Sequence, residues 1–166
     1  MLQDLLTFAS PREPAPVPSV MRAVISEAAA AVRGDPEMAG IRVRIRGDDP
    51  AVPVDRAQMH VVFLNLLLNA AQAMGLEGEI DVGIAAAHGE CKVTVADRGS
   101  GIAPALCETV FQPFFTTKSR GAGLGLATAR RIVESHGGSL TARPRDGGGT
   151  ALTVVLPLRP VVTSEA

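Results

Sequence analysis

Apolar residues recur at helical spacing in several stretches of the chain. In the strongest of them, residues 56–74, the apolar positions cover nearly every side, which indicates a helix buried against its neighbours. Asp55 directly precedes this stretch, and aspartate is a favoured residue at helix N-termini. Further helices are predicted from Ser19 to just before Gly34, near residues 104–110, and over residues 123–136.

Strict alternation of apolar and polar residues predicts the strands. A single strand is expected in "GIRVRIRGD", and two hairpins are expected in "GEIDVGIAAA" with "CKVTVAD" and in "SLTARPR" with "TALTVVLPL". The glycine-rich "DGGG" would supply the turn of the second hairpin. The order of elements is α, β, α, ββ, α, ββ. It predicts an α+β two-layer sandwich, with a mixed sheet of about five strands and three main helices on one face.

Prolines divide the chain near its beginning. Four of them fall within the nine residues "SPREPAPVP", a composition that favours an extended linker over a helix. Residues 1–10 carry apolar positions that suit the last turns of an amphipathic helix. We therefore expect a helical piece over 1–10, a linker over 11–18, one main domain over 19–158 and a flexible tail over 159–166.

Composition narrows the class of protein. A length of 166 residues with 46% hydrophobic content suits one packed domain, and the net charge of −1 argues against nucleic-acid binding. No apolar run reaches membrane-spanning length, so no direct membrane contact is expected. Cys91 and Cys107 lack the spacing of a zinc site and indicate a reducing compartment. The prediction is a cytoplasmic domain.

Two asparagines interrupt the helix predicted over 56–74. Asn65 and Asn69 are four residues apart and share one face, which Gln72 and Ala73 extend. Each amide could simply cap a nearby backbone group. Alternatively, an amide oxygen is a hard ligand suited to Mg²⁺, which takes much of its shell from water and phosphates.

A carboxylate followed by alternate glycines ends the first hairpin, in "DRGSGI". Asp97 could merely cap a tight turn. A buried carboxylate could also accept a hydrogen bond from the exocyclic amine of adenine, whereas guanine would present a carbonyl oxygen there. Gly99 and Gly101 would let the purine approach the backbone closely.

The third polar stretch precedes the helix predicted over 123–136. Its glycines could expose backbone N–H groups to a phosphate, although neither the P-loop nor the dinucleotide spacing fits. Hydroxyl and basic side chains stand just before these glycines. A flexible surface connection is the plainer alternative, and the residues concerned are Thr116, Thr117, Lys118, Arg120, Gly121, Gly123 and Gly125.

Together, these three motifs resemble the catalytic ATP-binding domain of bacterial sensor histidine kinases, within the Bergerat-fold group that includes gyrase and mismatch-repair MutL. "FLNLLLNAAQAM" is similar to the family's N box, "DRGSGI" to its G1 box, "FQPFFTTK" to its F box and "GAGLGLATARRIVESHGG" to its G2 box. The four boxes occur in the family's order, and the resemblance covers roughly residues 19–158. The nitrogen-regulatory subgroup is the most similar.

The resemblance implies ATP and Mg²⁺ as cofactors and a role for each matching residue. Asn69 would bind Mg²⁺, Asn65 and Lys118 would act on the phosphates, and Asp97 would bind adenine. The resemblance assigns the nucleotide site to Asn65, Asn69, Gln72, Ala73, Asp97, Gly99, Gly101, Ile102, Phe115, Thr116, Thr117, Lys118, Gly121, Ala122, Gly123, Leu124, Gly125, Leu126 and Thr150.

The implied activity is that of a protein-histidine kinase, a transferase. Hydrolytic relatives carry a glutamate at the position of Asn65, and an amide cannot act as a base for water attack. None of His60, His88 and His136 fits the family's acceptor. The acceptor would lie on a dimerisation domain, whose last turns residues 1–10 resemble. A receiver aspartate would then take the phosphoryl group. The full-length kinase would be a homodimer and this chain a monomer.

Other functions stay open at this point. An ATP-driven conformational switch like gyrase is one, although Asn65 argues against it. A degenerate docking module is another, because many family members carry Lys-Tyr where this chain has Gln72 and Ala73. A serine-kinase anti-sigma factor shares the first boxes, but "FFTTK" points away from it. The longer protein would be cytoplasmic, or the domain would be the cytoplasmic part of a membrane-associated sensor.

Overall fold

A computed structural model describes residues 12–115 and 124–159 of the chain. The predicted helical piece over 1–10 and most of the predicted tail therefore lie outside the described residues. Within the described ranges, no helix is both long enough and apolar enough to cross a membrane.

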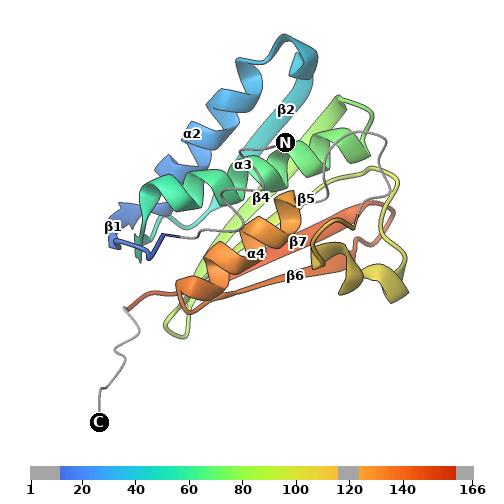
Figure 1. The fold of residues 1–166 in the computed structure, drawn as a ribbon. Coiled ribbons are helices and arrows are strands. Elements are labelled where there is room, and N and C mark those ends of the chain that lie inside the picture. The colour runs from blue at the N-terminus through green and yellow to red at the C-terminus, as the bar shows by residue number, and fades with distance from the viewer. Residues whose placement is uncertain (1–11, 116–123, 160–166) are drawn as a thin grey trace.

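Five strands form one mixed sheet in the order β2-β4-β5-β7-β6 (Figure 1). Strands β2 and β4 pair in parallel, and the other neighbours pair antiparallel. Both predicted hairpins are present, as β4 with β5 and as β6 with β7. The strands are β2 (Gly40–Gly47), β4 (Glu77–Ala87), β5 (Glu90–Ala96), β6 (Ser139–Pro144) and β7 (Thr150–Pro157).

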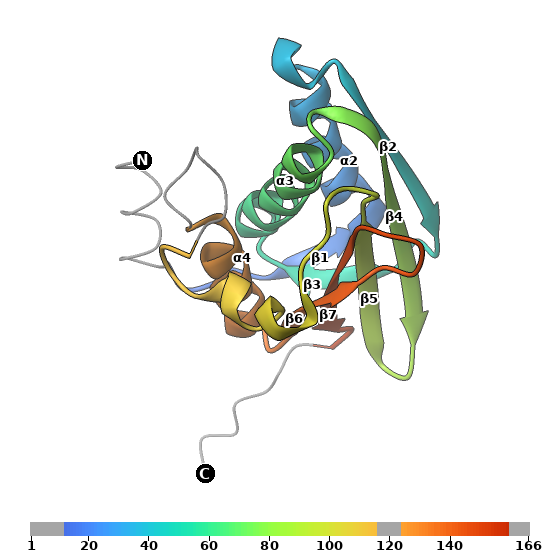
Figure 2. The same ribbon diagram turned by 90° about the vertical axis from the view of Figure 1, so that its right-hand side faces the viewer.

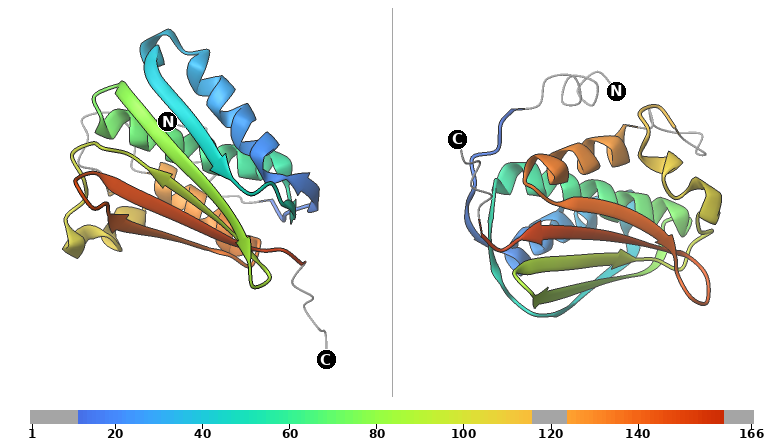
Figure 3. Two further views of the ribbon diagram at one scale, coloured as in Figure 1. Left: turned by 180° about the vertical axis from the view of Figure 1, so that it is seen from behind. Right: turned by 90° about the horizontal axis from the view of Figure 1, so that it is seen from below.

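Three helices, α2 (Met21–Arg33), α3 (Arg56–Ala73) and α4 (Gly125–Ser135), cover one face of this sheet (right panel of Figure 3). Helix α3 lies between α2 and α4 and packs against both (Figure 2). Among the described residues, no helix covers the other face of the sheet (left panel of Figure 3), and β7 accordingly alternates buried and half-buried residues. The predicted α+β two-layer sandwich is confirmed.

Helix α3 is the centre of the core, as its apolar sequence predicted. Phe63, Leu66 and Leu67 are fully buried, and the predicted N-cap is present because the Asp55 carboxylate accepts from the Gln58 N–H at 3.1 Å. The segment near residues 104–110, where a short helix was expected, has a different structure. It consists of two 3-10 turns, Pro104–Leu106 and Thr109–Phe111, because Pro104 begins the first turn and an intervening turn separates the two.

A second, two-stranded sheet was not predicted. Strand β1 (Val17–Val20) pairs antiparallel with β3 (Ala51–Val54), so the end of the proline-rich linker is tied to the domain. Each strand has only four residues and contains a proline, Pro18 or Pro53, which lacks a backbone donor. The two strands are far apart in sequence, and their pairing has no local signal.

Candidate functional site

Helix α4 begins against the middle of α3. Asn65 is half-buried on α3, and its amide nitrogen donates to the Val61 carbonyl one turn earlier at 3.0 Å. A Cβ at Gly125, the first residue of α4, would lie only 3.0 Å from the Asn65 amide oxygen. Glycine therefore lets the start of α4 approach the Asn65 amide. Asn69 lies one turn further along α3 and is half-buried too.

The C-terminal end of α3 holds the loop that follows β5. The Ser100 N–H donates to the Ala73 carbonyl at 3.1 Å. A Cβ at Gly99 would overlap that same carbonyl group, so only glycine fits at this approach. The predicted G1 glycine therefore serves to bring the loop after Asp97 onto α3.

Asp97 directly follows β5 and is only 1% exposed. One carboxylate oxygen, Oδ1, accepts from the Gly99 N–H at 2.8 Å, and the Asp97 N–H donates to the Thr150 carbonyl at 2.9 Å. Within residues 12–115 and 124–159, no hydrogen bond reaches its other oxygen, Oδ2. A buried carboxylate with a spare acceptor oxygen is the arrangement that could receive an amine from a ligand.

The turn between β6 and β7 closes over the backbone of Asp97. Gly149 has φ of +95°, and a Cβ there would collide with the Asp97 carbonyl oxygen. Arg145 donates to the same carbonyl at 3.3 Å and to the Asp81 carboxylate at 3.0 Å. The sequence assigned Arg145 no predicted role, and it assigned Gly149 only a place in the turn of the second hairpin. The three glycines before Thr150 were the one available signal.

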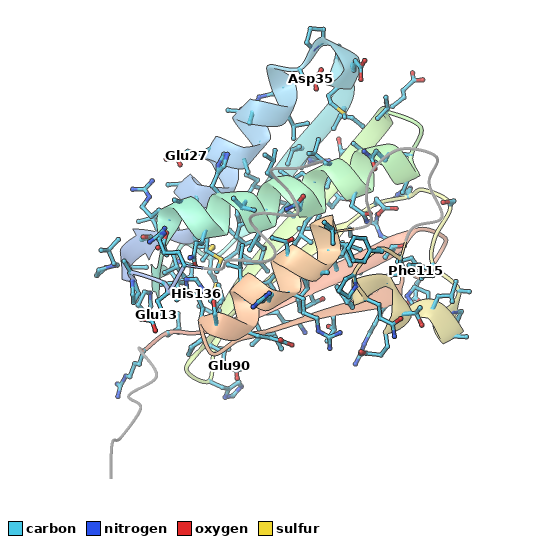
Figure 4. The ribbon with its side chains drawn as sticks, viewed as in Figure 1. Glu13, Glu27, Asp35, Glu90, Phe115 and His136 are labelled. Carbon is cyan, nitrogen blue, oxygen red and sulfur yellow. The ribbon has the colours of Figure 1, made fainter. Side chains whose placement is uncertain are left out.

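The phenylalanines of the F box lie at the end of the molecule where α4 begins, as Figure 4 shows for Phe115. Phe115 is half-buried, whereas Phe114 is 62% exposed and has φ of +66°, a strained conformation for a bulky residue. Phe111 is buried, and the Arg130 guanidinium lies 4.8 Å from the centre of its ring.

The predicted site residues that the structure describes lie along the second half of α3, just after the end of β5, and at the beginnings of α4 and β7. Leu124 is buried there, Leu126 and Ile102 pack against the core, and Gln72 is exposed. The remaining predicted residues lie outside the described ranges. They are Thr116, Thr117, Lys118, Gly121, Ala122 and Gly123.

Comparison with known proteins gives a consistent set of matches. The family model described as "Histidine kinase-, DNA gyrase B-, and HSP90-like ATPase" matches residues 54–160. Sensor histidine kinase ZraS of Escherichia coli strain K12 is 34% identical over 160 residues, which cover 95% of this chain and 34% of that protein. The C4-dicarboxylate transport sensor protein DctS of Rhodobacter capsulatus is 44% identical over 119 residues, covering 69% and 18%.

Solved structures of similar sequence share the fold. The mycobacterial sensor histidine kinase MprB is 31% identical with a TM-score of 0.76, covering 89% of this chain and 98% of that chain. Histidine kinase ThkA in complex with response regulator protein TrrA is 26% identical with a TM-score of 0.80, covering 96% and 46%. The chain spans about a third of the length of ZraS and less of DctS.

Proposed function

Because this chain belongs to the histidine kinase-, DNA gyrase B- and HSP90-like ATPase family, we propose that it binds Mg²⁺–ATP as the catalytic domain of a sensor histidine kinase. The observation that carries the proposal is the Asp97 carboxylate. It is buried directly after β5, its Oδ1 accepts from the Gly99 N–H, and its Oδ2 receives no hydrogen bond from the described residues.

Asp97 would select adenine by hydrogen-bond chemistry. An ionised carboxylate only accepts, so Oδ2 pairs with the exocyclic amine of adenine. Guanine carries a carbonyl oxygen at the same place, so this oxygen and Asp97 Oδ2 would face each other as two acceptors. A buried acceptor without a donor costs about 1–3 kcal/mol of binding free energy. Gly99 and Gly149 would shape the adenine pocket indirectly. The space that their side chains would occupy is filled by the Ala73 and Asp97 carbonyls, so these glycines hold together the loops on either side of Asp97.

The phosphates would lie over α3, beside the start of α4. Asn69 would supply an amide oxygen to Mg²⁺, and Asn65 would support the phosphates. Within the part of the chain that the structure describes, no three His, Cys, Asp or Glu side chains cluster as a metal site. This fits a Mg²⁺ that takes most of its ligands from phosphate and water. Lys118 and the glycines before Leu124 would close over the triphosphate.

Transfer to a histidine is favoured over hydrolysis. Helix α3 contains no Asp or Glu that could activate water. The γ-phosphoryl would pass to a histidine of a dimerisation domain outside this chain, and positioning and electrostatics would supply most of the catalysis. His136 is not that acceptor, because both of its ring nitrogens already make hydrogen bonds, to Asp55 and Ile132.

The partners follow from this proposal. A response-regulator aspartate would receive the phosphoryl group, and the complex of ThkA with the response regulator TrrA supports this, since ThkA is similar to this chain. The longer protein would be a homodimer with the domain in the cytoplasm, either free or below a membrane-associated sensor, whereas this chain alone would be a monomer.

Calorimetric titration with non-hydrolysable ATP and GTP analogues in Mg²⁺ tests the proposal. We expect the ATP analogue to bind and the GTP analogue to bind at least about tenfold more weakly. Asp97→Asn should lower the affinity for the ATP analogue by a similar factor. Asp35→Asn makes the same chemical change at the far end of α2 and should bind like the wild type (Figure 4). Equal binding of both analogues would refute the Asp97 assignment. Steady ATP turnover by this chain alone would instead favour an ATPase switch.

A further inference from the structure

A single buried carboxylate holds the segment that precedes the domain. Asp55 is 4% exposed, and its Oδ1 caps α3 through the Gln58 N–H at 3.1 Å. Its other oxygen, Oδ2, accepts from the Ala15 N–H at 3.0 Å and pairs with the Arg12 guanidinium at 2.8 Å. The N-cap of α3 is therefore also an anchor for residues 12–15.

A second side chain of α3 contacts the same segment. The side-chain nitrogen of Gln58, Nε2, donates to the Arg12 carbonyl at 2.7 Å. Two side chains, at the N-cap and in the first turn of α3, thus hold the backbone at residues 12 and 15. Strand β1 begins two residues later and pairs with β3. The chain is therefore held at residues 12 and 15 and again from Val17 onward, whereas its prolines alone predicted only an extended linker.

The C-terminal end of α4 contacts the N-cap of α3. The Asp55 N–H donates to His136 Nε2 at 3.0 Å, and His136 Nδ1 lies 2.8 Å from the Ile132 carbonyl. Nε2 must be the acceptor here, so the proton is assigned to Nδ1, which donates to Ile132. Figure 4 shows His136 and the linker residue Glu13 at the same end of the molecule.

We propose that Asp55 and Gln58 form a docking site for the chain's own residues 12–15, with His136 holding the backbone of Asp55 in place. The site turns the proline-rich linker into a fixed joint, so that whatever precedes Arg12 enters the domain in one direction. The contact is chemically specific, since Asp55 Oδ2 accepts from both the Arg12 guanidinium and the Ala15 N–H. The joint is separate from the proposed nucleotide site, because along α3 it lies about 15 Å from Asn65 and about 27 Å from Ala73.

Amide hydrogen exchange on the isotope-labelled chain tests this docking. Ala15 is an exposed residue, so the hydrogen bond to Asp55 is what should protect its amide. We expect wild-type protection that Asp55→Asn reduces by about ten- to a hundredfold, as for a hydrogen bond to a charged group. Asparagine is also a good N-cap, so the Gln58 amide should keep its protection and serve as the internal reference.

A second variant tests the docking of residues 12–15 even if Asp55→Asn also destabilises the start of α3. Arg12→Gln removes the guanidinium and leaves the cap untouched, and it should lower Ala15 protection with Gln58 unchanged. Binding of the ATP analogue should be the same in both variants and in the wild type. An Ala15 amide that exchanges freely in the wild type, or that stays protected in Arg12→Gln, would overturn the proposal.

Discussion

Replacing Gly99 by alanine tests the contact that brings the Asp97 loop onto α3. The added Cβ would overlap the Ala73 carbonyl and lie 2.8 Å from the Ala73 Cβ, where carbon atoms prefer about 3.5–4.0 Å. The loop must therefore move away from α3. The hydrogen bond from Ser100 to Ala73 at 3.1 Å would be strained or lost.

The magnitude follows from three effects. Overpacking costs about 1–3 kcal/mol and a lost hydrogen bond about 0.5–1.5 kcal/mol, while alanine restricts the unfolded chain and returns about 0.4–1 kcal/mol. The net loss for Gly99→Ala is about 2 kcal/mol, or about 4–8 °C in melting temperature for a chain of this size. Binding of the ATP analogue should weaken as well, because the Asp97 loop shifts.

Gly83→Ala is the matched control for this experiment. Gly83 lies in β4, a Cβ added there would have nothing within 4 Å, and its φ is not in the left-handed region. The same change should there be neutral or stabilising by up to about 1 kcal/mol. Thermal unfolding followed by circular dichroism measures both variants. If Gly99→Ala melted together with Gly83→Ala, the steric reasoning would be wrong.

Three further predictions concern other side chains. Burial raises the pKa of Asp55, but the backbone N–H groups and the guanidinium that face it outweigh burial and lower the pKa below its ordinary 3.8. The wild type should therefore have a higher free energy of unfolding than Asp55→Asn, and this difference should be constant above about pH 5. The difference should shrink as the pH drops below 3.8 and through the lowered pKa of the folded state. Denaturant titration of both proteins at several pH values measures it. Burial and the nearby Asp48 charge raise the pKa of Cys91 to about 11, so thiol labelling at about pH 8 should modify Cys107 quickly and Cys91 only after unfolding. Arg145→Gln should weaken binding of the ATP analogue several-fold by calorimetry, because it releases the Asp97 backbone in the proposed adenine pocket. Unchanged binding would show that this contact is dispensable.

The fold was predictable wherever the pattern was local. Helix α3 has a long apolar run and a capping aspartate, and both hairpins combine alternation with turn glycines. The pairing of β1 with β3 was not predictable. Two four-residue strands that contain prolines give no periodic signal, and only the packed domain brings them together.

The candidate site likewise contains some residues that the sequence predicted and others that it did not. Asp97 and Gly99 stood out because a carboxylate and glycines follow a strand directly. Arg145 and Gly149 act on the Asp97 carbonyl from a distant part of the sequence, so their role depends on a contact that no spacing reveals. Asn65 remains a prediction, since its amide caps the Val61 carbonyl as the plainer interpretation proposed, and its oxygen still faces the start of α4.

The antiparallel packing of α4 on α3 connects the two sites that we propose. Gly125 at the start of α4 lies against Asn65, and His136 at its end is bonded to Asp55 at the start of α3. Helix α3 is thus contacted twice, at Asn65 by the start of α4 and at its N-cap by the linker joint. Because both contacts involve the ends of one rigid helix of 11 residues, the direction of the incoming chain and the position of Gly125 are fixed relative to each other. Under the function proposed above, the domain would present ATP to a histidine outside itself. Such a fixed relation would then serve the reaction, since phosphoryl transfer depends on positioning.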